Sequence, residues 1–276
     1  MAFNFNELKK RLLSSFAIIT LIVILLIFSE NIYGKIIFSI LLSTFSTFTV
    51  LEYIYLAKSK EVHLLSPLLI ICSFIQTFSF FIASQYPHYS ELPFFTLFIF
   101  SLAIFIFHFR RLQESIIDIA ISIFSLIYIT VPIGLIFLIL YSSKLTVFDG
   151  KIAFLYLLIV TKGADIGAYF GGKLFGKHLL SPQISPNKTY EGAVVGFLFS
   201  LGLSICFAVF KLITLDKAIF LGIAIGIIGQ IGDLSESLFK RDAKTKDSSS
   251  LPGLGGLLDM VDSILFTTPL VYFFLI

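Results

Sequence analysis

The sequence predicts an all-α, polytopic integral membrane protein with about nine membrane-spanning helices. Of its 276 residues, 57% are hydrophobic and only 13% are charged, whereas about a quarter of a typical soluble domain is charged. The mean hydropathy is +0.99, so the polar residues are too few to cover a soluble globule. The apolar runs are continuous and do not alternate with a period of two, which argues against a transmembrane β-barrel.

The expected spans follow from the rule that a helix needs about 20 mainly apolar residues to cross the hydrocarbon core. They are residues 12–29, 36–57, 65–84, 93–109, 116–141, 152–173, 190–210, 217–239 and 258–276. The first run is longer than the apolar core of a signal peptide, and no small-x-small site follows Ser29, so we expect a retained span. Pro132 lies within the long fifth run and permits a kink or a re-entrant break there.

The basic residues predict the orientation, because cytoplasmic loops carry an excess of Lys and Arg. If the N-terminus is cytoplasmic, that side collects Lys9, Lys10, Arg11, Lys58, Lys60, Arg110, Arg111, Lys173, Lys177, Lys188, Lys240, Arg241, Lys244 and Lys246. The other side keeps Lys35, Lys144, Lys151, Lys211 and Lys217. The 173–189 and 240–257 loops are therefore expected to face the cytoplasm, where soluble nucleotides would reach them. A net charge of +3 gives no reason to expect nucleic acid as a partner.

The chain divides into two regions of different composition. Residues 1–150 are rich in Phe, Ile and Leu, and we expect them to form an N-terminal transmembrane scaffold. Residues 151–276 hold most of the glycines and the ionisable residues of the spans. In the scaffold, Glu52 and Asp118 lie near span ends, and we interpret them as snorkelling or paired structural residues. Glycines recur every fourth residue at 163, 167 and 171, which predicts close helix packing.

Ionised side chains gather near the ends of the later spans, where each needs a partner or a function because burying charge in lipid costs a few kcal/mol. Three groups follow helical spacing: Lys162 and Asp165; Asp233, Glu236, Ser237 and Lys240; Asp259 and Asp262. The first pair shares a helix face and could simply be mutually neutralising. The other two groups are joined by a basic, Gly-rich segment, residues 240–256.

Carboxylates beside such a segment suit metal-assisted phosphoryl or nucleotidyl transfer better than a proton relay, which needs no basic loop. Mg²⁺ takes oxygen ligands and bridges substrate phosphates, while Lys, Arg and exposed backbone N–H groups bind phosphate oxygens. An ordinary charged loop between two spans would have the same composition, and that alternative stays open. A second polar segment, residues 185–192, predicts Thr189 as the N-cap of the seventh span, with Lys188 at a helix N-terminus that favours anions.

Both segments resemble the phosphatidate cytidylyltransferases, also called CDP-diacylglycerol synthases. The downstream family pattern runs S-x-x-K-R, four residues, K-D, a short Gly/Ser loop and P-G-H-G-G-x-x-D-R-x-D-S. It is matched by Ser237-Leu238-Phe239-Lys240-Arg241, by Lys246-Asp247 and by Pro252-Gly253-Leu254-Gly255-Gly256-Leu257-Leu258-Asp259-Met260-Val261-Asp262-Ser263. Upstream, the stretch from Asp165 to Gly192 is similar to D-x-x-A-Y-x-x-G-K-x-x-G-K followed by S-P-x-K-T-x-E-G. Two long motifs in the right order make the resemblance specific.

The resemblance implies condensation of CTP with phosphatidate, giving CDP-diacylglycerol and pyrophosphate in phospholipid biosynthesis. It implies Mg²⁺ as cofactor, with a monovalent cation such as K⁺ beside it, and it makes residues 151–276 the catalytic region. If the roles of the matching family residues hold here, the resemblance implies Asp233, Asp259 and Asp262 as metal ligands, with Asp165 and Glu191 as further candidates. Lys240 and Arg241 join Asp259 and Asp262 as catalytic residues, and the phosphate-binding set is Lys188, Ser237, Lys246, Gly255 and Gly256. We expect a bacterial inner-membrane protein with its active site at the cytoplasmic face, as a monomer or a homodimer.

Three departures from the pattern concern the phosphate site. Leu254 stands where the family has His, Met260 where it has Arg, and the loop from Asp247 to Pro252 is one residue short. Neither Leu nor Met can replace the missing hydrogen-bond donors. Because the carboxylates and the other bases are retained, we expect an active enzyme whose phosphate site is arranged somewhat differently.

Three alternatives remain from the sequence. A CTP-dependent lipid kinase would use comparable residues, with Asp165 or Glu191 as base for a hydroxyl nucleophile. An ion-coupled transporter would explain Lys162 and Asp165, but no inverted repeat is visible and the charges lie at one membrane face. A non-catalytic relative that binds CTP or lipid would explain Leu254 and Met260.

Overall fold

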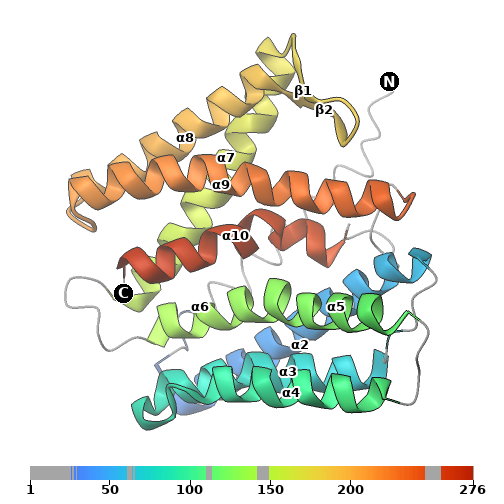
Figure 1. Ribbon diagram of the computed structural model, residues 1–276. Coiled ribbons are helices and arrows are strands. Elements are labelled where there is room, and N and C mark those ends of the chain that lie inside the picture. The colour runs from blue at the N-terminus through green and yellow to red at the C-terminus, as the bar shows by residue number, and fades with distance from the viewer. Residues whose placement is uncertain are drawn as a thin grey trace, which may run out of the picture.

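The computed structural model describes residues 26, 28, 30–60, 64, 66–109, 114–141, 149–245 and 256–275. Its helices, drawn in Figure 1, are α2 (Ile32–Ala57), α3 (Ser66–Gln85), α4 (Leu92–His108), α5 (Ser115–Ser125), α6 (Val131–Tyr141), α7 (Gly150–Phe175), α8 (Tyr190–Val209), α9 (Leu215–Asp242) and α10 (Leu257–Leu275). An antiparallel hairpin of β1 (Leu179–Ser181) and β2 (Ser185–Thr189) lies between α7 and α8. Neither strand was predicted from the sequence.

Within the described part of the chain, eight helices are long and apolar enough to cross a membrane. They confirm the all-α polytopic class and the expected spans from the second to the ninth. The expected first span, 12–29, falls almost entirely on residues that the structure does not describe. The long fifth run continues as a single candidate span, Ser115–Tyr141, and is not broken into a re-entrant pair. A π-helical turn, Leu126–Thr130, lies just before Pro132 and joins α5 to α6.

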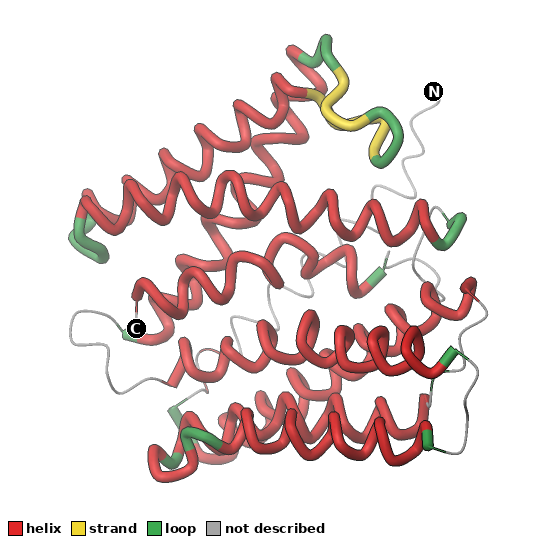
Figure 2. The backbone as a smooth tube through the Cα atoms, viewed as in Figure 1, coloured by secondary structure: helices red, strands yellow, loops and turns green. Residues whose placement is uncertain are grey.

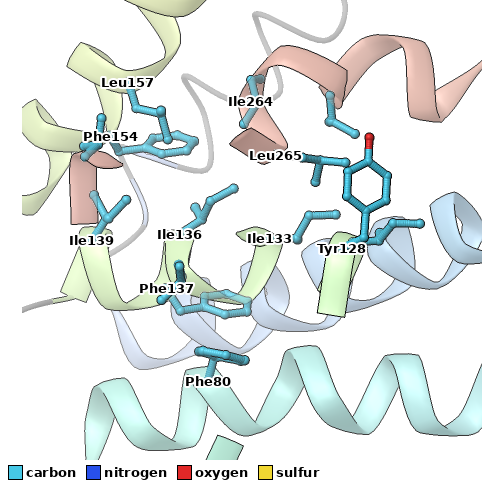
Figure 3. Close-up of a cluster of buried hydrophobic side chains, with 14 of the residues drawn as sticks. Phe80, Tyr128, Ile133, Ile136, Phe137, Ile139, Phe154, Leu157, Ile264 and Leu265 are labelled. Carbon is cyan, nitrogen blue, oxygen red and sulfur yellow. The ribbon is translucent and has the colours of Figure 1, made fainter. Parts of the chain in front are cut away.

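The helices stack in layers, with α10 between the scaffold helices and α9 (Figure 1). α10 contacts α2, α6, α7 and α9, so it is packed against both halves of the chain. One buried apolar cluster crosses the same boundary, with side chains from α3, the π-helical turn, α6, α7 and α10 (Figure 3). Its labelled members are Phe80, Tyr128, Ile133, Ile136, Phe137, Ile139, Phe154, Leu157, Ile264 and Leu265. The scaffold and the C-terminal region therefore share one core.

Close packing between α7 and α8 confirms the expectation from the glycine spacing. A Cβ added at Gly163, Gly167 or Gly171 would overlap side chains of α8. A Cβ added on α8 would in turn overlap α7, since at Gly196 it would lie 2.8 Å from the carbonyl oxygen of Ala164. These two helices therefore approach each other backbone to backbone.

The hairpin lies beyond the adjoining ends of α7 and α8 and beside the C-terminal end of α9 (Figure 2). Arg241, at the end of α9, fixes this arrangement by donating from Nε to the carbonyl oxygen of Ile184 in the hairpin turn, at 3.0 Å. The N-terminal end of α10 lies on the same side of the molecule (Figure 1). The hairpin, the C-terminal end of α9 and the N-terminal end of α10 thus lie on one side of the molecule.

Candidate active site

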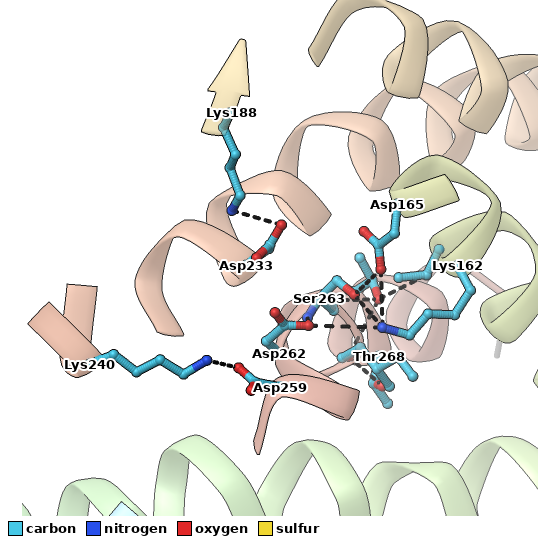
Figure 4. Close-up of polar contacts among 12 residues, drawn as sticks. Lys162, Asp165, Lys188, Asp233, Lys240, Asp259, Asp262, Ser263 and Thr268 are labelled. Carbon is cyan, nitrogen blue, oxygen red and sulfur yellow. Dashed lines mark hydrogen bonds and ion pairs between the residues drawn. The ribbon is translucent and has the colours of Figure 1, made fainter. Parts of the chain in front are cut away.

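Charged side chains from α7, β2, α9 and α10 converge in one cluster (Figure 4). α7 supplies Lys162 and Asp165, and β2 supplies Lys188. α9 and α10 supply the rest: Asp233, Glu236, Lys240, Asp259, Asp262 and Ser263. The convergence brings together residues that are up to 101 positions apart in the chain.

Lys162 is surrounded by oxygen atoms from its own helix and from α10. Its Nζ lies 3.0 Å from Asp165 Oδ2 and 3.0 Å from Ser263 Oγ, and 3.9 Å from Asp262 Oδ1. Ser263 also donates from its hydroxyl to Asp165, at 2.8 Å, and from its backbone N–H to Asp262 Oδ1, at 2.6 Å. The predicted pairing of Lys162 with Asp165 is confirmed, and Ser263 extends it to α10.

The other two lysines each pair with carboxylates at the ends of α9 and α10. Lys188 Nζ lies 2.7 Å from Asp233 Oδ2. Lys240 Nζ lies 2.8 Å from Glu236 Oε1, one turn earlier on α9, and forms a second ion pair with Asp259 of α10. Glu236 is only 1% exposed, so Lys240 is its neutralising partner in the protein interior.

Among the described residues, no three His, Cys, Asp or Glu side chains lie together as a ready metal site. The three predicted metal ligands instead face three different lysines. Asp233 faces Lys188, Asp259 faces Lys240, and Asp262 faces Lys162.

The donor set nevertheless suits a hard divalent cation. It offers only oxygen ligands, which is the preference of Mg²⁺. With every group ionised, the ion-paired set also holds more carboxylates than ammonium groups, namely Asp165, Asp233, Glu236, Asp259 and Asp262 against Lys162, Lys188 and Lys240. The surplus equals the charge of one divalent ion.

The N-terminus of α10 is shaped by two carboxylates. Asp259 accepts a long hydrogen bond from the backbone N–H of Gly256, at 3.4 Å. Glu52, from α2 in the scaffold, accepts from the backbone N–H of Leu258, at 3.0 Å. These bonds satisfy N–H groups that have no partner within the first turn of a helix. The scaffold thus contacts the helix that carries Asp259 and Asp262.

The family resemblance made Glu191 a candidate metal ligand, but its carboxylate is engaged elsewhere in the structure. Its carboxylate accepts from the backbone N–H groups of Lys177 and His178, at 3.0 and 3.2 Å, and lies 2.6 Å from His178 Nδ1. It therefore holds the turn between α7 and the hairpin. The neighbouring prediction is confirmed, because Thr189 caps α8 by accepting from the backbone N–H of Gly192, at 3.1 Å.

The remaining predicted residues are placed only in part. Arg241 ties α9 to the hairpin, and Ser237 lies half-buried on α9, one turn after Asp233. Lys246 and Gly255, like Leu254, lie outside the described residues.

Three contributions were missed by reasoning from the sequence. Nothing in the sequence indicated that Ser263 would join Lys162, since the two lie on different helices. Glu236 was noted only as part of a polar stripe, although burial makes it the partner of Lys240. The bond from Leu258 to Glu52 was also missed, although Glu52 stood out as a carboxylate within an apolar run. Asp118, by contrast, has the paired structural role expected for it, with a carboxylate oxygen 3.7 Å from His108 Nε2.

Comparison with known proteins supports one family. Residues 9–276 match the model of the cytidylyltransferase family. A phosphatidate cytidylyltransferase of Chlamydia pneumoniae is 35% identical over 288 residues, which cover 99% of this chain and 93% of the relative. Proteins of the same name from Haemophilus influenzae and Staphylococcus aureus (strain COL) are 42% and 39% identical, over 46% and 59% of this chain and 46% and 61% of their own lengths.

Proposed function

The chain belongs to the cytidylyltransferase family, and from this premise we propose that it condenses CTP with phosphatidate to form CDP-diacylglycerol and pyrophosphate. An oxygen of the lipid phosphate attacks the α-phosphorus of CTP. The bond from that phosphorus to the bridging oxygen breaks, and pyrophosphate leaves with the electron pair. The observation that carries the proposal is the set of lysine–carboxylate pairs that three helices and the hairpin bring together.

The main obstacle to this reaction is repulsion, because one polyanion must attack another. No strong general base is needed, since the lipid phosphate is already ionised. Lys188 and Lys240 would exchange their carboxylate partners for phosphate oxygens, and the N-terminus of α10 favours negative charge at the same place. Arg241, Lys246, Ser237, Gly255 and Gly256 complete the proposed phosphate-binding set.

We propose Mg²⁺ as the cofactor. As Lys188 and Lys240 turn toward phosphate, Asp233 and Asp259 would be released to hold the metal. Asp262 would join them through its second carboxylate oxygen while it stays beside Lys162, with Asp165 nearby. Bound there, a divalent ion neutralises the phosphates and stabilises charge that develops on the leaving group. Glu191 is left out of this set, because its carboxylate is engaged at the turn after α7.

We further propose that the site faces the cytoplasm of a bacterial cell, at the inner membrane. The excess of basic residues predicted on this side supports the orientation. CTP would arrive from water and phosphatidate from the adjoining lipid leaflet. In this arrangement residues 1–150 act as scaffold and residues 151–276 as the catalytic region, and the homodimer remains the proposed alternative to a monomer.

The test uses purified protein in lipid–detergent micelles with phosphatidate, Mg²⁺ and CTP labelled separately at the α- and γ-phosphates. Transfer of the α label to lipid, with labelled pyrophosphate released, is the expected result. Movement of the γ label to a supplied polyprenol would instead identify a lipid kinase. If neither label moves while a related enzyme works under the same conditions, the catalytic proposal is wrong.

A further inference from the structure

We propose that the ammonium group of Lys162 is a built-in cation of the active site. It fills a cation position formed by Asp165, Asp262 and Ser263, which would otherwise take up an exchangeable ion. The wild-type protein would then need no K⁺ at this position, in contrast to the monovalent ion that the resemblance implies. The proposal rests on the proposed function only for its activity measurement.

The surroundings of Lys162 are those of a bound cation. Its Nζ lies 3.0 Å from a carboxylate oxygen of Asp165, 3.0 Å from the hydroxyl of Ser263 and 3.9 Å from a carboxylate oxygen of Asp262 (Figure 4). These groups come from two helices, α7 and α10. Oxygen atoms from carboxylates and a hydroxyl are also the donors that a small metal ion would take. An ammonium has three N–H donors and a single positive charge, so it can occupy such a position without leaving it.

The backbone of α7 is held firmly at this point. Thr161, the preceding residue, is fully buried, and its hydroxyl lies 3.1 Å from that of Thr267 on α10. Gly163, the following residue, packs directly against Leu203 of α8. The backbone that carries the Lys162 side chain is therefore held by α8 and α10.

Lys162 differs in this respect from the other two lysines of the site. Lys188 lies on the hairpin and Lys240 lies in the last turn of α9, both next to connecting segments. Lys162 lies in the middle of α7, three residues from its partner Asp165. It is thus placed to stay with its carboxylates while the other two bind phosphate.

Removal of the ammonium would leave Asp165 and Asp262 with two negative charges beside one hydroxyl. Repulsion between the two carboxylates would favour uptake of another cation. The position is open enough for exchange, because the side chains of Lys162 and Asp165 are 36% and 30% exposed. A small cation could therefore enter where the lysine side chain has been removed.

The activity test is chemical rescue of Lys162→Ala, assayed with Mg²⁺ and with N-methylglucamine as the only other cation. The wild type should be active there and should change less than about twofold on addition of K⁺. The variant should lose at least about tenfold and regain most of the loss with K⁺ or ammonium. Lys151→Ala, on the same helix and paired with Glu30 instead, is the matched control and should behave as the wild type.

A binding measurement keeps the inference separate from the proposed function. Equilibrium dialysis with radioactive Rb⁺ should show one more bound ion per chain in Lys162→Ala than in the wild type or Lys151→Ala. If the alanine variant is not recovered folded, Lys162→Ser also opens the position and carries the same expectation. A wild type that needs K⁺, or a folded variant that neither binds Rb⁺ nor responds to small cations, would overturn the inference. An inactive wild type would refute the proposed function alone, since the Rb⁺ result still decides the role of Lys162.

Discussion

The N-terminal helices α2 to α6 and the C-terminal helices α7 to α10 differ in how closely their backbones approach one another. In the scaffold, aromatic rings fill the space between helices: Phe137 packs edge-on against Phe38 and Phe81, with ring centroids 5.8 and 5.6 Å apart. Hydroxyl groups add interhelical bonds, such as that from Thr77 to Ser46, at 2.8 Å.

In the C-terminal region, ring pairs such as Tyr156–Phe207 and Phe220–Phe274 are also present, but glycines add close contacts between helix backbones. A Cβ at Gly192 would lie 2.7 Å from the carbonyl oxygen of Ala168, and a Cβ at Gly232 would lie 2.5 Å from that of Asp262. The backbone of α7 therefore touches that of α8, and the backbone of α9 touches that of α10. Because lipid gives helices little hydrophobic reason to associate, small residues that allow close contact are a main source of packing energy.

This difference shows how a membrane protein can keep charged groups at fixed separations. Side chains that fill space can repack when a ring rotates, whereas two touching backbones leave little freedom for either helix. The carboxylates of α9 and α10 are attached at such a contact, next to Gly232. Away from Glu52, which accepts a hydrogen bond from the N-terminus of α10, the packing of the scaffold should tolerate more change.

The largest expected effect on turnover comes from replacing the carboxylates of α10. Asp259→Asn or Asp262→Asn should lower turnover by at least about 100-fold, since loss of an outer-shell partner already costs a metal site about 10–100-fold. Cytidylyl transfer and the amount of protein in the membrane are measured together. Asp216→Asn is the control, because Asp216 lies in the first turn of α9, at the other end of that helix. Near-normal turnover in either variant would remove that aspartate from the site.

The next largest effect is expected at the contact between α9 and α10. Gly232→Ala should destabilise the protein by about 1–3 kcal/mol, as overpacking does, and should lower activity because α10 must move away from α9. Gly202→Ala is the matched control, since a Cβ there meets nothing within 4 Å. Thermal unfolding in detergent compares the two. Equal behaviour of both variants would show that backbone contact does not fix the site.

A smaller effect is expected where the scaffold meets the site. Glu52→Ala removes the acceptor for the backbone N–H of Leu258 and should cost about 1 kcal/mol, the usual value of a helix cap. Turnover should fall by about tenfold, as for an outer-shell partner, while the KM for CTP changes little. Glu52→Gln keeps an acceptor oxygen and should recover most of the activity. If glutamine and alanine are equally poor, the negative charge is what matters and not the cap.

The smallest effect is expected within the scaffold itself. Thr77→Val removes the hydroxyl bond to Ser46 and should cost only about 0.6 kcal/mol, the average for hydrogen bonds between membrane helices. Turnover per folded molecule should be unchanged. A loss of activity without a loss of stability would mean that the packing of α2 against α3, and not Glu52 alone, shapes the site.

The elements that follow from local patterns could be predicted from the sequence. The spans follow from apolar run length, and the Thr189 cap follows from its position before an apolar run. The choice of partner for each charge could not be predicted, because Lys162 with Ser263 and Glu52 with Leu258 are distant in the chain. The hairpin was missed for another reason: its strands are three and five residues long and carry no alternating pattern.

The hydrogen bond between Glu52 and Leu258 also limits how early during synthesis the site can assemble. The two residues are 206 positions apart, so at a synthesis rate of about 5–20 residues per second the carboxylate waits roughly 10–40 s for its partner. α7 and α9 likewise wait for the aspartates of α10. A nascent chain held at any earlier point would lack part of the proposed active site, so we expect activity to begin only after α10 has left the ribosome.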